Sequence, residues 1–166
     1  RAMWSGHPAT FHGKHYQIDG AYCEPRPDPA PPIAVGGAGE KYLLRVVAQY
    51  ADWWNYIYAD RAGYAHKQAV LQEHCKAVGR DYGEIVQIPH AGVLIAESER
   101  ELQKMKERPD VRPASENTIV GTPEQVTEKL REAIAQGGHR LVVNLLDAPR
   151  PEGTWLFAAA VLPHLE

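Results

Sequence analysis

Short apolar segments alternate with longer amphipathic segments over most of the chain. Four apolar segments have the length of β-strands, at residues 33–35, 53–58, 86–96 and 141–146. Segments with one apolar face predict helices, at residues 40–50, 61–78, 99–108, 123–136 and 152–165. Continuous apolar strands that alternate with amphipathic helices are typical of a parallel sheet covered by helices. The pattern therefore predicts an α/β fold with four parallel β-α units.

The amino-terminal part follows a different pattern. Two β-prone runs between Ala9 and Ile18 flank the pair Gly13 and Lys14, which predicts a β-hairpin. Residues 25–32 are rich in proline and predict an extended linker, because proline fits neither a helix interior nor a central strand.

These elements are treated as one domain over residues 1–166. The hairpin and the linker occupy residues 1–32, and the β-α units occupy residues 33–166. Residues 1–4 carry no helix start signal and look like the end of a helix that begins earlier.

Two of the predicted helices begin with capping signals. Thr122 is followed by Pro123 and, three positions later, by Gln125, which is a capping box with proline at the first helical position. Ser98 and Glu101 have the same spacing. These signals predict that the two helices begin at Glu99 and at Pro123.

Composition and charge exclude several classes of protein. With 44% hydrophobic and 23% charged residues and a net charge of −3, the chain is typical of globular proteins and has no basic excess for nucleic acid. No apolar run approaches the ~20 residues that span a bilayer, so no membrane partner is expected. Cys23 and Cys75 are too few for a disulfide scaffold. The residues after Arg1 have no signal-peptide pattern, and we expect a cytoplasmic protein.

A glycine-rich segment, Gly36-Gly37-Ala38-Gly39, follows the first apolar strand and precedes a helix. Chemistry in parallel β/α folds takes place at the carboxyl ends of the strands. Glycines let a ligand approach the backbone, and the free amides of a first helical turn bind phosphate. A tight turn without a ligand is an equal alternative, since the spacing matches neither standard nucleotide fingerprint. Glu40 either competes with phosphate for these amides or points away.

Histidines near the start of the chain suggest a metal site only weakly. His7, His12 and His15 lack the spacing of metal ligands, and no cysteine or carboxylate completes a motif. We therefore predict no metal site and a solvated hairpin.

The second predicted helix contains three further residues with possible chemistry. His66 and His74 are expected to face solvent. Cys75 has apolar neighbours, which favours a core position over a nucleophile.

Polar residues lie within or just after the apolar strands, at Asn55, His90, Asn144 and Asp147. Side chains at strand ends can face a barrel mouth. Asn144 interrupts an apolar strand and needs a hydrogen-bond partner, for which a structural role is favoured. His90 fits either a satisfied core position or a ligand-facing one.

Three aromatic residues alternate along one predicted strand, at Trp54, Tyr56 and Tyr58. They form either a surface for a flat ring system or part of the packed core, and the packed core is favoured.

Several segments, taken in order, point to one family. They are Met3-Trp4, 11–16, the proline-rich run up to Ile33, 36–41, 44–45, Ala48, 50–55, 120–126 and 162–163. In order and spacing they resemble the bacterial luciferase-like monooxygenase superfamily, and within it the branch of coenzyme F420-dependent oxidoreductases. The chain departs from the family pattern at Ala38, at Trp53 and in residues 137–140.

The resemblance implies a TIM (β/α)8 barrel, of which the chain is the C-terminal half, with a flavin or deazaflavin at the carboxyl ends of the strands. It implies that Gly36, Gly37, Ala38 and Gly39 hold the cofactor phosphate and that Asn55 belongs to the cofactor site. No catalytic residue is assigned, because the family's amino-terminal strands have no counterpart here.

The expected function is hydride transfer between coenzyme F420 and a small organic substrate. FMN-dependent monooxygenation is the alternative within the superfamily, and a non-catalytic half-barrel that binds a phosphate-bearing ligand is an alternative outside it. A barrel enzyme acting on phosphosugars is a third, weaker interpretation. Four parallel strands cannot close a barrel, so we expect either a homodimer or association with a missing N-terminal half.

Overall fold

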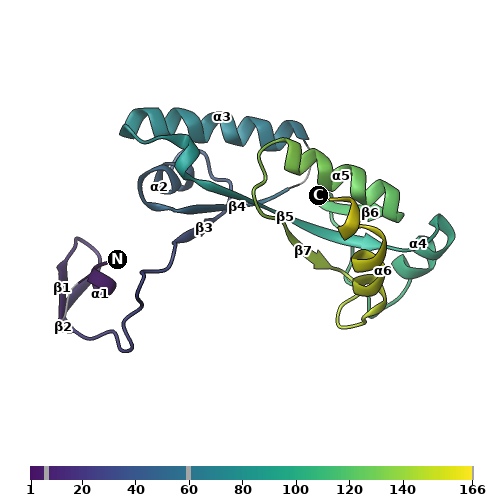
Figure 1. Ribbon diagram of the computed structural model, residues 1–166, viewed down its shortest axis with the longest axis horizontal. Coiled ribbons are helices and arrows are strands. Elements are labelled where there is room, and N and C mark those ends of the chain that lie inside the picture. The colour runs from purple at the N-terminus through teal and green to yellow at the C-terminus, as the bar shows by residue number, and fades with distance from the viewer. Residues whose placement is uncertain (6–7, 59–60, 166) are drawn as a thin grey trace. The chain divides into compact units, whose positions relative to one another are not determined.

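The computed structural model describes residues 1–5, 8–58 and 61–165, and the chain forms two compact units, Arg1–Pro32 and Ile33–Glu166. The first unit contains a short helix, α1 (Ala2–Ser5), and an antiparallel hairpin of β1 (Ala9–His12) and β2 (Gln17–Ala21) (Figure 1). The predicted hairpin is confirmed.

The hairpin loop is longer than the sequence suggests. Residues 13–16 connect the strands, and the amide of Gly13 donates to the carbonyl oxygen of Tyr16 at 2.9 Å. A Cβ atom on Gly13 would lie 2.9 Å from the carbonyl oxygen of Tyr16 and 2.5 Å from the ring of Phe11, so a side chain there would force the loop to shift. His12 and His15 lie in this unit, whereas His7 lies outside the described residues.

The second unit is a parallel sheet with helices between its strands (Figure 1). The strands are β3 (Ala34–Gly36), β4 (Trp53–Ile57), β5 (Val86–Ile95), β6 (Thr118–Gly121) and β7 (Val142–Leu145). The helices are α2 (Leu43–Tyr50), α3 (Arg61–Val78), η1 (Tyr82–Glu84), α4 (Glu99–Lys106), α5 (Pro123–Ala135), α6 (Glu152–Ala160) and η2 (Leu162–His164). The predicted α/β fold with parallel β-α units is confirmed.

The sheet contains a fifth strand, β6, that the sequence pattern did not predict. It has four residues, too few to show a hydrophobic period beside a polar loop. It forms because the ten-residue strand β5 offers it a partner, with Gly92 opposite Thr118. Gly92 also lies opposite Asn144 of β7, and His90 lies between Ile57 of β4 and β7. Strands β4 and β6 therefore follow one another along one edge of β5, and β7 occupies the other edge.

The last predicted helix is shorter than expected. Helix α6 ends at Ala160, and residues 162–164 form a separate 3₁₀ turn. Pro163 is the physical reason, because its ring and missing N–H prevent a continuous α-helix. Helix α3 in contrast matches its predicted bounds, and Gly79 ends it with φ of +69°.

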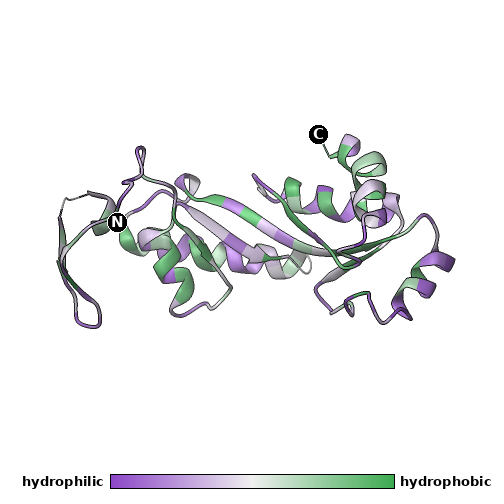
Figure 2. Ribbon diagram, turned by 90° about the horizontal axis from the view of Figure 1, so that it is seen from below, coloured by the Kyte–Doolittle hydropathy of each residue, from purple (hydrophilic) through white to green (hydrophobic). Residues whose placement is uncertain are grey.

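One face of β4 carries the main aromatic core. Trp54, Tyr56 and Tyr58 are buried beneath α2 and α3, and each of their rings lies 5.3–5.9 Å from the ring of Tyr64. The favoured packing interpretation of these aromatics is correct. The helices carry apolar and polar residues on different faces (Figure 2), as this packing requires. Alternation along a strand then places Trp53, Asn55 and Ile57 on the opposite face, here called the inner face of the sheet.

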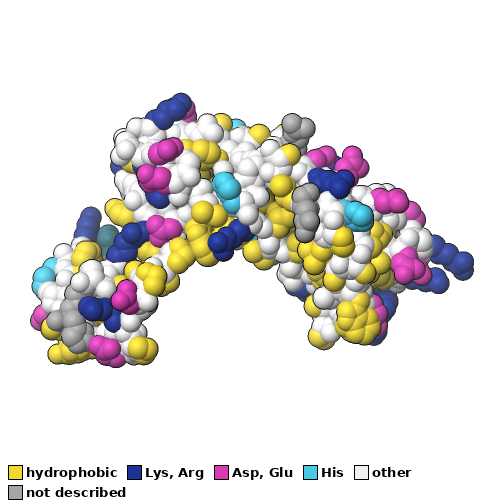
Figure 3. Space-filling model, in the orientation of Figure 1, with side chains coloured by type: hydrophobic (Ala, Val, Ile, Leu, Met, Phe, Trp, Pro, Cys, Tyr) yellow, Lys and Arg dark blue, Asp and Glu magenta, His cyan; other side chains and the backbone are white. Residues whose placement is uncertain are grey.

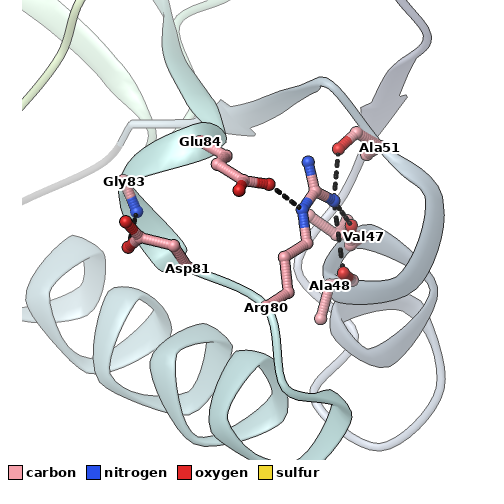
Figure 4. A network of polar contacts seen from close by, with 7 residues as sticks. All are labelled: Val47, Ala48, Ala51, Arg80, Asp81, Gly83 and Glu84. Carbon is pink, nitrogen blue, oxygen red and sulfur yellow. Dashed lines mark hydrogen bonds and ion pairs between the residues drawn. The ribbon is translucent and has the colours of Figure 1, made fainter.

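Arg80 ties the end of α2 to the segment after α3 (Figure 4). Its Nη1 atom donates to the carbonyl oxygens of Ala51 at 2.7 Å, Ala48 at 3.2 Å and Val47 at 3.5 Å, and its Nε atom donates to Glu84. The last carbonyls of a helix lack intrahelical donors and favour a cation. Arg80 thus fixes α2, the helix that follows the glycine-rich segment.

The surface carries charges of both signs. Lysine and arginine side chains are interspersed with aspartate and glutamate on the face that Figure 3 shows. Within the described ranges, none of the helices has the length and hydropathy needed to cross a membrane.

Candidate functional site

The glycine-rich segment lies where expected, at the carboxyl end of β3. Gly36 is the last residue of the strand and lies opposite Asn55 of β4 in the parallel register. Helix α2 begins only at Leu43, so a turn of three residues separates the segment from the helix. The prediction that the helix begins directly after Gly39 is wrong. The amide of Leu44 donates to the carbonyl oxygen of Gly39 at 3.0 Å, which forms a wider turn before the helix.

Gly37 is held on both sides by β4. Its amide donates to the carbonyl oxygen of Asn55 at 2.9 Å, and its carbonyl oxygen accepts from the indole Nε1 of Trp54 at 2.9 Å. Its φ of +125° is strained for any other residue, and a Cβ atom there would lie 2.8 Å from Leu43 Cδ1. The fold thus specifies glycine at this position.

The next amides are open. Within the described ranges, the backbone N–H groups of Ala38, Gly39 and Glu40 donate to no protein acceptor. Ala38 is half-buried and packs against the core, whereas Gly39 is exposed. Successive unpaired amides beyond a strand end suit an anionic oxygen group. The segment therefore fits the phosphate group that the sequence suggests.

The side chain of Glu40 is bound by α3. Its Oε1 atom accepts from Lys67 Nζ at 2.5 Å and lies 2.9 Å from His66 Nε2, and its backbone oxygen lies 2.7 Å from His74 Nε2. The hydrogen bond from Lys67, followed by that from His66, lowers the pKa of Glu40. The carboxylate is thus bound by side chains of α3 and does not compete for the loop amides. The prediction that these histidines face solvent is correct for His66, whose side chain is 61% exposed, whereas His74 is half-buried, and both contact Glu40.

Asn55 lies beside the loop on the inner face. Its Nδ2 atom donates to the carbonyl oxygen of Ile88 at 3.1 Å, which fixes the amide. Its Oδ1 atom lies 3.7 Å from the position of a Cβ atom on Gly36. The structure therefore brings Asn55 together with the glycine-rich segment.

The other polar residues at strand ends have structural contacts. Asn144 Oδ1 accepts from Arg112 Nη2 at 2.8 Å, which is the partner its position requires. The buried Asp147 accepts from the amide of Gly153 at 2.8 Å, at the start of α6. His90, in the middle of β5, lines a cavity together with Ile57 and Asn144.

The two cysteines and the histidines offer little other chemistry. Cys75 is buried, and burial raises the pKa of its thiol, as expected of a core cysteine. Among the residues that the structure describes, no group of three or more His, Cys, Asp or Glu side chains is placed to hold a metal ion.

Two departures from the family pattern contact one another. The guanidinium of Arg140 lies 4.7 Å from the centre of the Trp53 ring, a cation–π contact. The bulk of Trp53 thus packs against the unusual segment before β7.

Lys67 and Arg112 are site residues that the sequence pattern did not indicate. Lys67 is 27 positions from its partner Glu40, and Arg112 is 32 positions from its partner Asn144, so neither belongs to a local motif. Only the packing of α3 beside the loop and of residues 109–117 beside β7 brings them into contact.

Comparison with solved structures supports the same architecture. The F420-dependent tetrahydromethanopterin reductase of Methanopyrus kandleri is 17% identical, with a TM-score of 0.75 over 99% of this chain and 60% of that one. An F420-dependent secondary alcohol dehydrogenase is 13% identical, with a TM-score of 0.78 over 99% and 58%. The oxygenating constituent of a Pseudomonas putida diketocamphane monooxygenase, in complex with FMN, is 16% identical, with a TM-score of 0.64 over 98% and 60%.

The chain spans about three fifths of the length of these three structures. A search of curated proteins found no match. The model of the family described as luciferase-like monooxygenase matches residues 1–112, more than half of the chain. The order of the β-α units, the glycine-rich segment at the end of β3 and this match agree, and the chain belongs to the luciferase-like monooxygenase family.

Proposed function

We propose that the chain is the carboxyl-terminal half of an F420-dependent oxidoreductase that transfers a hydride between the deazaflavin and a small organic substrate. The observation that carries the proposal is the run of three open amides at residues 38–40, beside Asn55 at the carboxyl end of the sheet. Of the solved structures named above, two are F420-dependent and one is in complex with FMN, so they fit either cofactor, and the titrations described below separate the two.

Each loop residue has a distinct part in the proposed site. Gly37 supplies the positive φ of the turn, Gly36 lies beside Asn55, and the amides of Ala38, Gly39 and Glu40 donate to the oxygens of a phosphate group. The indole of Trp54 and the backbone of Asn55 hold Gly37 in place. When bound, the cofactor supplies the hydride chemistry, and the protein binds and orients it.

The α3 contacts keep the loop suitable for an anion. Lys67 and His66 bind the Glu40 carboxylate, and without them its negative charge would oppose a phosphate at the neighbouring amides. Lys67 is thus a positioning residue in this proposal, since it acts on the loop through Glu40.

The inner face of the sheet requires a cover. Ile57 is 55% exposed and Val142 is 44% exposed there, although both belong to strands. We propose that the remaining β-α units of a complete barrel cover this face, provided by an N-terminal half or by a second copy in a homodimer. Native mass spectrometry separates the two, because a homodimer has twice the 18.5 kDa mass of the chain.

Cofactor binding tests the proposed site. The purified chain is titrated with F420 and, separately, with FMN, and the bound cofactor is measured by ultrafiltration and visible absorption. We expect F420 to bind more tightly than FMN. Gly37→Ala should weaken F420 binding about tenfold or more, because a non-glycine residue at φ of +125° costs about 1–3 kcal/mol.

A second glycine provides the matched control. Gly79 also has a positive φ, +69°, but lies at the end of α3 with no atom within 4 Å of an added Cβ. Gly79→Ala should leave F420 binding unchanged. Failure of the wild-type chain to bind F420, or equal losses in the two variants, would contradict the proposal, and preferential binding of FMN would favour the monooxygenase alternative.

A further inference from the structure

A second cavity lies beside the last residue of β4, the middle of β5 and the start of β6. It has a volume of about 260 Å³ and is bounded by residues of β4, β5, β7 and the segment before β6. Those used below are Ile57, Pro113, Leu146, Arg112, Ser115 and Asn144. Ile57 lies two positions after Asn55 on the same strand, so the cavity and the glycine-rich segment share the inner face.

Arg112 is fixed at the edge of this cavity by β7. Its Nη2 atom donates to Asn144 Oδ1 at 2.8 Å and to the carbonyl oxygen of Leu145 at 2.6 Å, and its amide donates to the carbonyl oxygen of Leu146 at 3.0 Å. The two side-chain bonds use only the Nη2 atom of the guanidinium. The Nε and Nη1 groups have no protein acceptor in the part of the chain that the structure describes, and their donor positions are oriented before any ligand arrives.

The charge around the cavity suits an anion. Of the described residues that line it, none is acidic. The nearest carboxylate in sequence, Asp110, is bound by Arg108 at 3.1 Å and by Arg150, and the hydrogen bond from Arg108 lowers its pKa to about 2. Within residues 1–5, 8–58 and 61–165, no carboxylate forms an ion pair with Arg112.

The rest of the wall is apolar. Ile57, Leu146 and Pro113 face the space beside the guanidinium. An inorganic anion would leave these apolar side chains in contact with water, whereas an organic anion with an apolar body would bury them. The cavity thus offers one wall for a charged oxygen group and one wall for a hydrophobic body.

We propose that this cavity binds the substrate, and that the substrate is a small organic carboxylate whose anionic group pairs with Arg112 while its apolar body lies against Ile57 and Leu146. Its description as a substrate site rests on the proposed F420-dependent function, since the cofactor site lies on the same face. The binding of a carboxylate by Arg112 stands without a cofactor.

Benzoate and its neutral analogue benzamide test the charge requirement on the unmodified chain. Their binding is measured by isothermal titration calorimetry at low ionic strength, without cofactor. A hydrogen-bonded charge pair predicts that benzoate binds about tenfold more tightly than benzamide, and that added salt reduces the difference. Equal affinity for the two compounds would overturn the proposal.

Arg112→Ala should abolish the preference for benzoate, and Arg112→Lys should restore only part of it, because an ammonium group lacks the planar donor pair. Arg100→Ala, at an exposed position of α4, is the matched control and should change nothing. Unchanged benzoate binding in Arg112→Ala would refute the assignment.

Loss of the bonds to β7 can also unfold the Arg112 variants, so a second pair of variants leaves those bonds intact. Ile57→Glu places a negative charge at the exposed Ile57 position, and Ile57→Gln is its neutral equivalent. We expect Ile57→Glu to weaken benzoate binding about fivefold or more relative to Ile57→Gln and to leave benzamide binding equal in both. Equal benzoate binding in the two variants would overturn the proposal.

Failure of this inference and failure of the proposed function are distinguishable. F420 titrations depend on the glycine-rich segment and are read by absorption, whereas benzoate titrations contain no cofactor. Benzoate binding without F420 binding would retain the carboxylate site and reject the cofactor assignment, and the reverse result would do the opposite.

Discussion

Substitution of Arg80 by alanine tests how the end of α2, and with it the loop before α2, is held in place. The guanidinium contributes bonds to the carbonyl oxygens of Ala48 and Ala51, both fully buried residues, and a longer contact of 3.5 Å to Val47. The Arg80 side chain is only 19% exposed, so water screens these bonds weakly. The substitution leaves these carbonyls without their donor.

The expected loss of stability follows from these contacts. A hydrogen bond from a charged donor contributes about 1.5–3 kcal/mol, and water entering the vacated space replaces part of two such bonds. The favourable interaction of a cation with a helix carboxyl end adds about 0.3–1 kcal/mol. The Glu84 side chain is 62% exposed, and its pair with Arg80 adds about 0.5 kcal/mol or less. We expect Arg80→Ala to lower the free energy of unfolding by about 2–3 kcal/mol and Tm by about 5–10 °C.

Urea and thermal unfolding followed by circular dichroism measure this change. Arg45→Ala, at an exposed position of α2, is the matched control and should stay within about 0.5 kcal/mol of the unmodified chain. Glu84→Ala separates the ion pair from the carbonyl bonds and should cost about 0.5 kcal/mol or less. A loss below about 0.5 kcal/mol for Arg80→Ala, or equal losses for Arg80→Ala and Glu84→Ala, would refute the reasoning.

Three further predictions concern the ionisable groups. The pKa of Asp110 is lowered from 3.8 to about 2, so its ion pairs stabilise the folded state above pH 3.8, and this stabilisation is lost as the pH falls toward 2. In acid unfolding experiments, Asp110→Asn should therefore reduce the dependence of the free energy of unfolding on pH between about 4 and 2. Lys67→Met should weaken F420 binding and raise the pKa of Glu40, read by NMR titration of the carboxyl carbon, and an unchanged pKa would reject the ion pair. In a thiol titration with a disulfide reagent, the half-exposed Cys23 should react before Cys75, because burial raises the pKa of the Cys75 thiol and opposes thiolate formation. Equal reaction rates for the two cysteines would contradict the core position of Cys75.

Local signals predicted much of the fold. Thr122 and Gln125 form their expected contact, in which Gln125 Oε1 accepts from the amide of Thr122 at 2.8 Å. Ser98 Oγ accepts from the amide of Glu101 at 3.4 Å, as the spacing indicates. Such signals are readable because donor and acceptor lie three residues apart, so the chain needs no tertiary partner to bring them together.

The candidate site was predictable only in part. The glycine-rich segment was recognisable because a positive φ at Gly37 and a close contact with Leu43 exclude other residues there. The later start of α2 was not recognisable, because it depends on the turn that brings Glu40 against α3. The pairing of the unusual Trp53 and Arg140 was likewise hidden, since 87 positions of sequence separate them.

The amino-acid sequence by itself determined the strands with long apolar runs, the capped helices, the amino-terminal hairpin and the glycine-rich segment, because each depends on contacts between near neighbours. The tertiary structure alone decided the existence of β6, the binding of Glu40 by Lys67 and the place of Arg112 beside Asn144. These features arise when distant segments meet on the sheet. A short strand gains its hydrogen bonds from β5, and a charged side chain gains its partner from another element, so neither leaves a periodic signal in the chain.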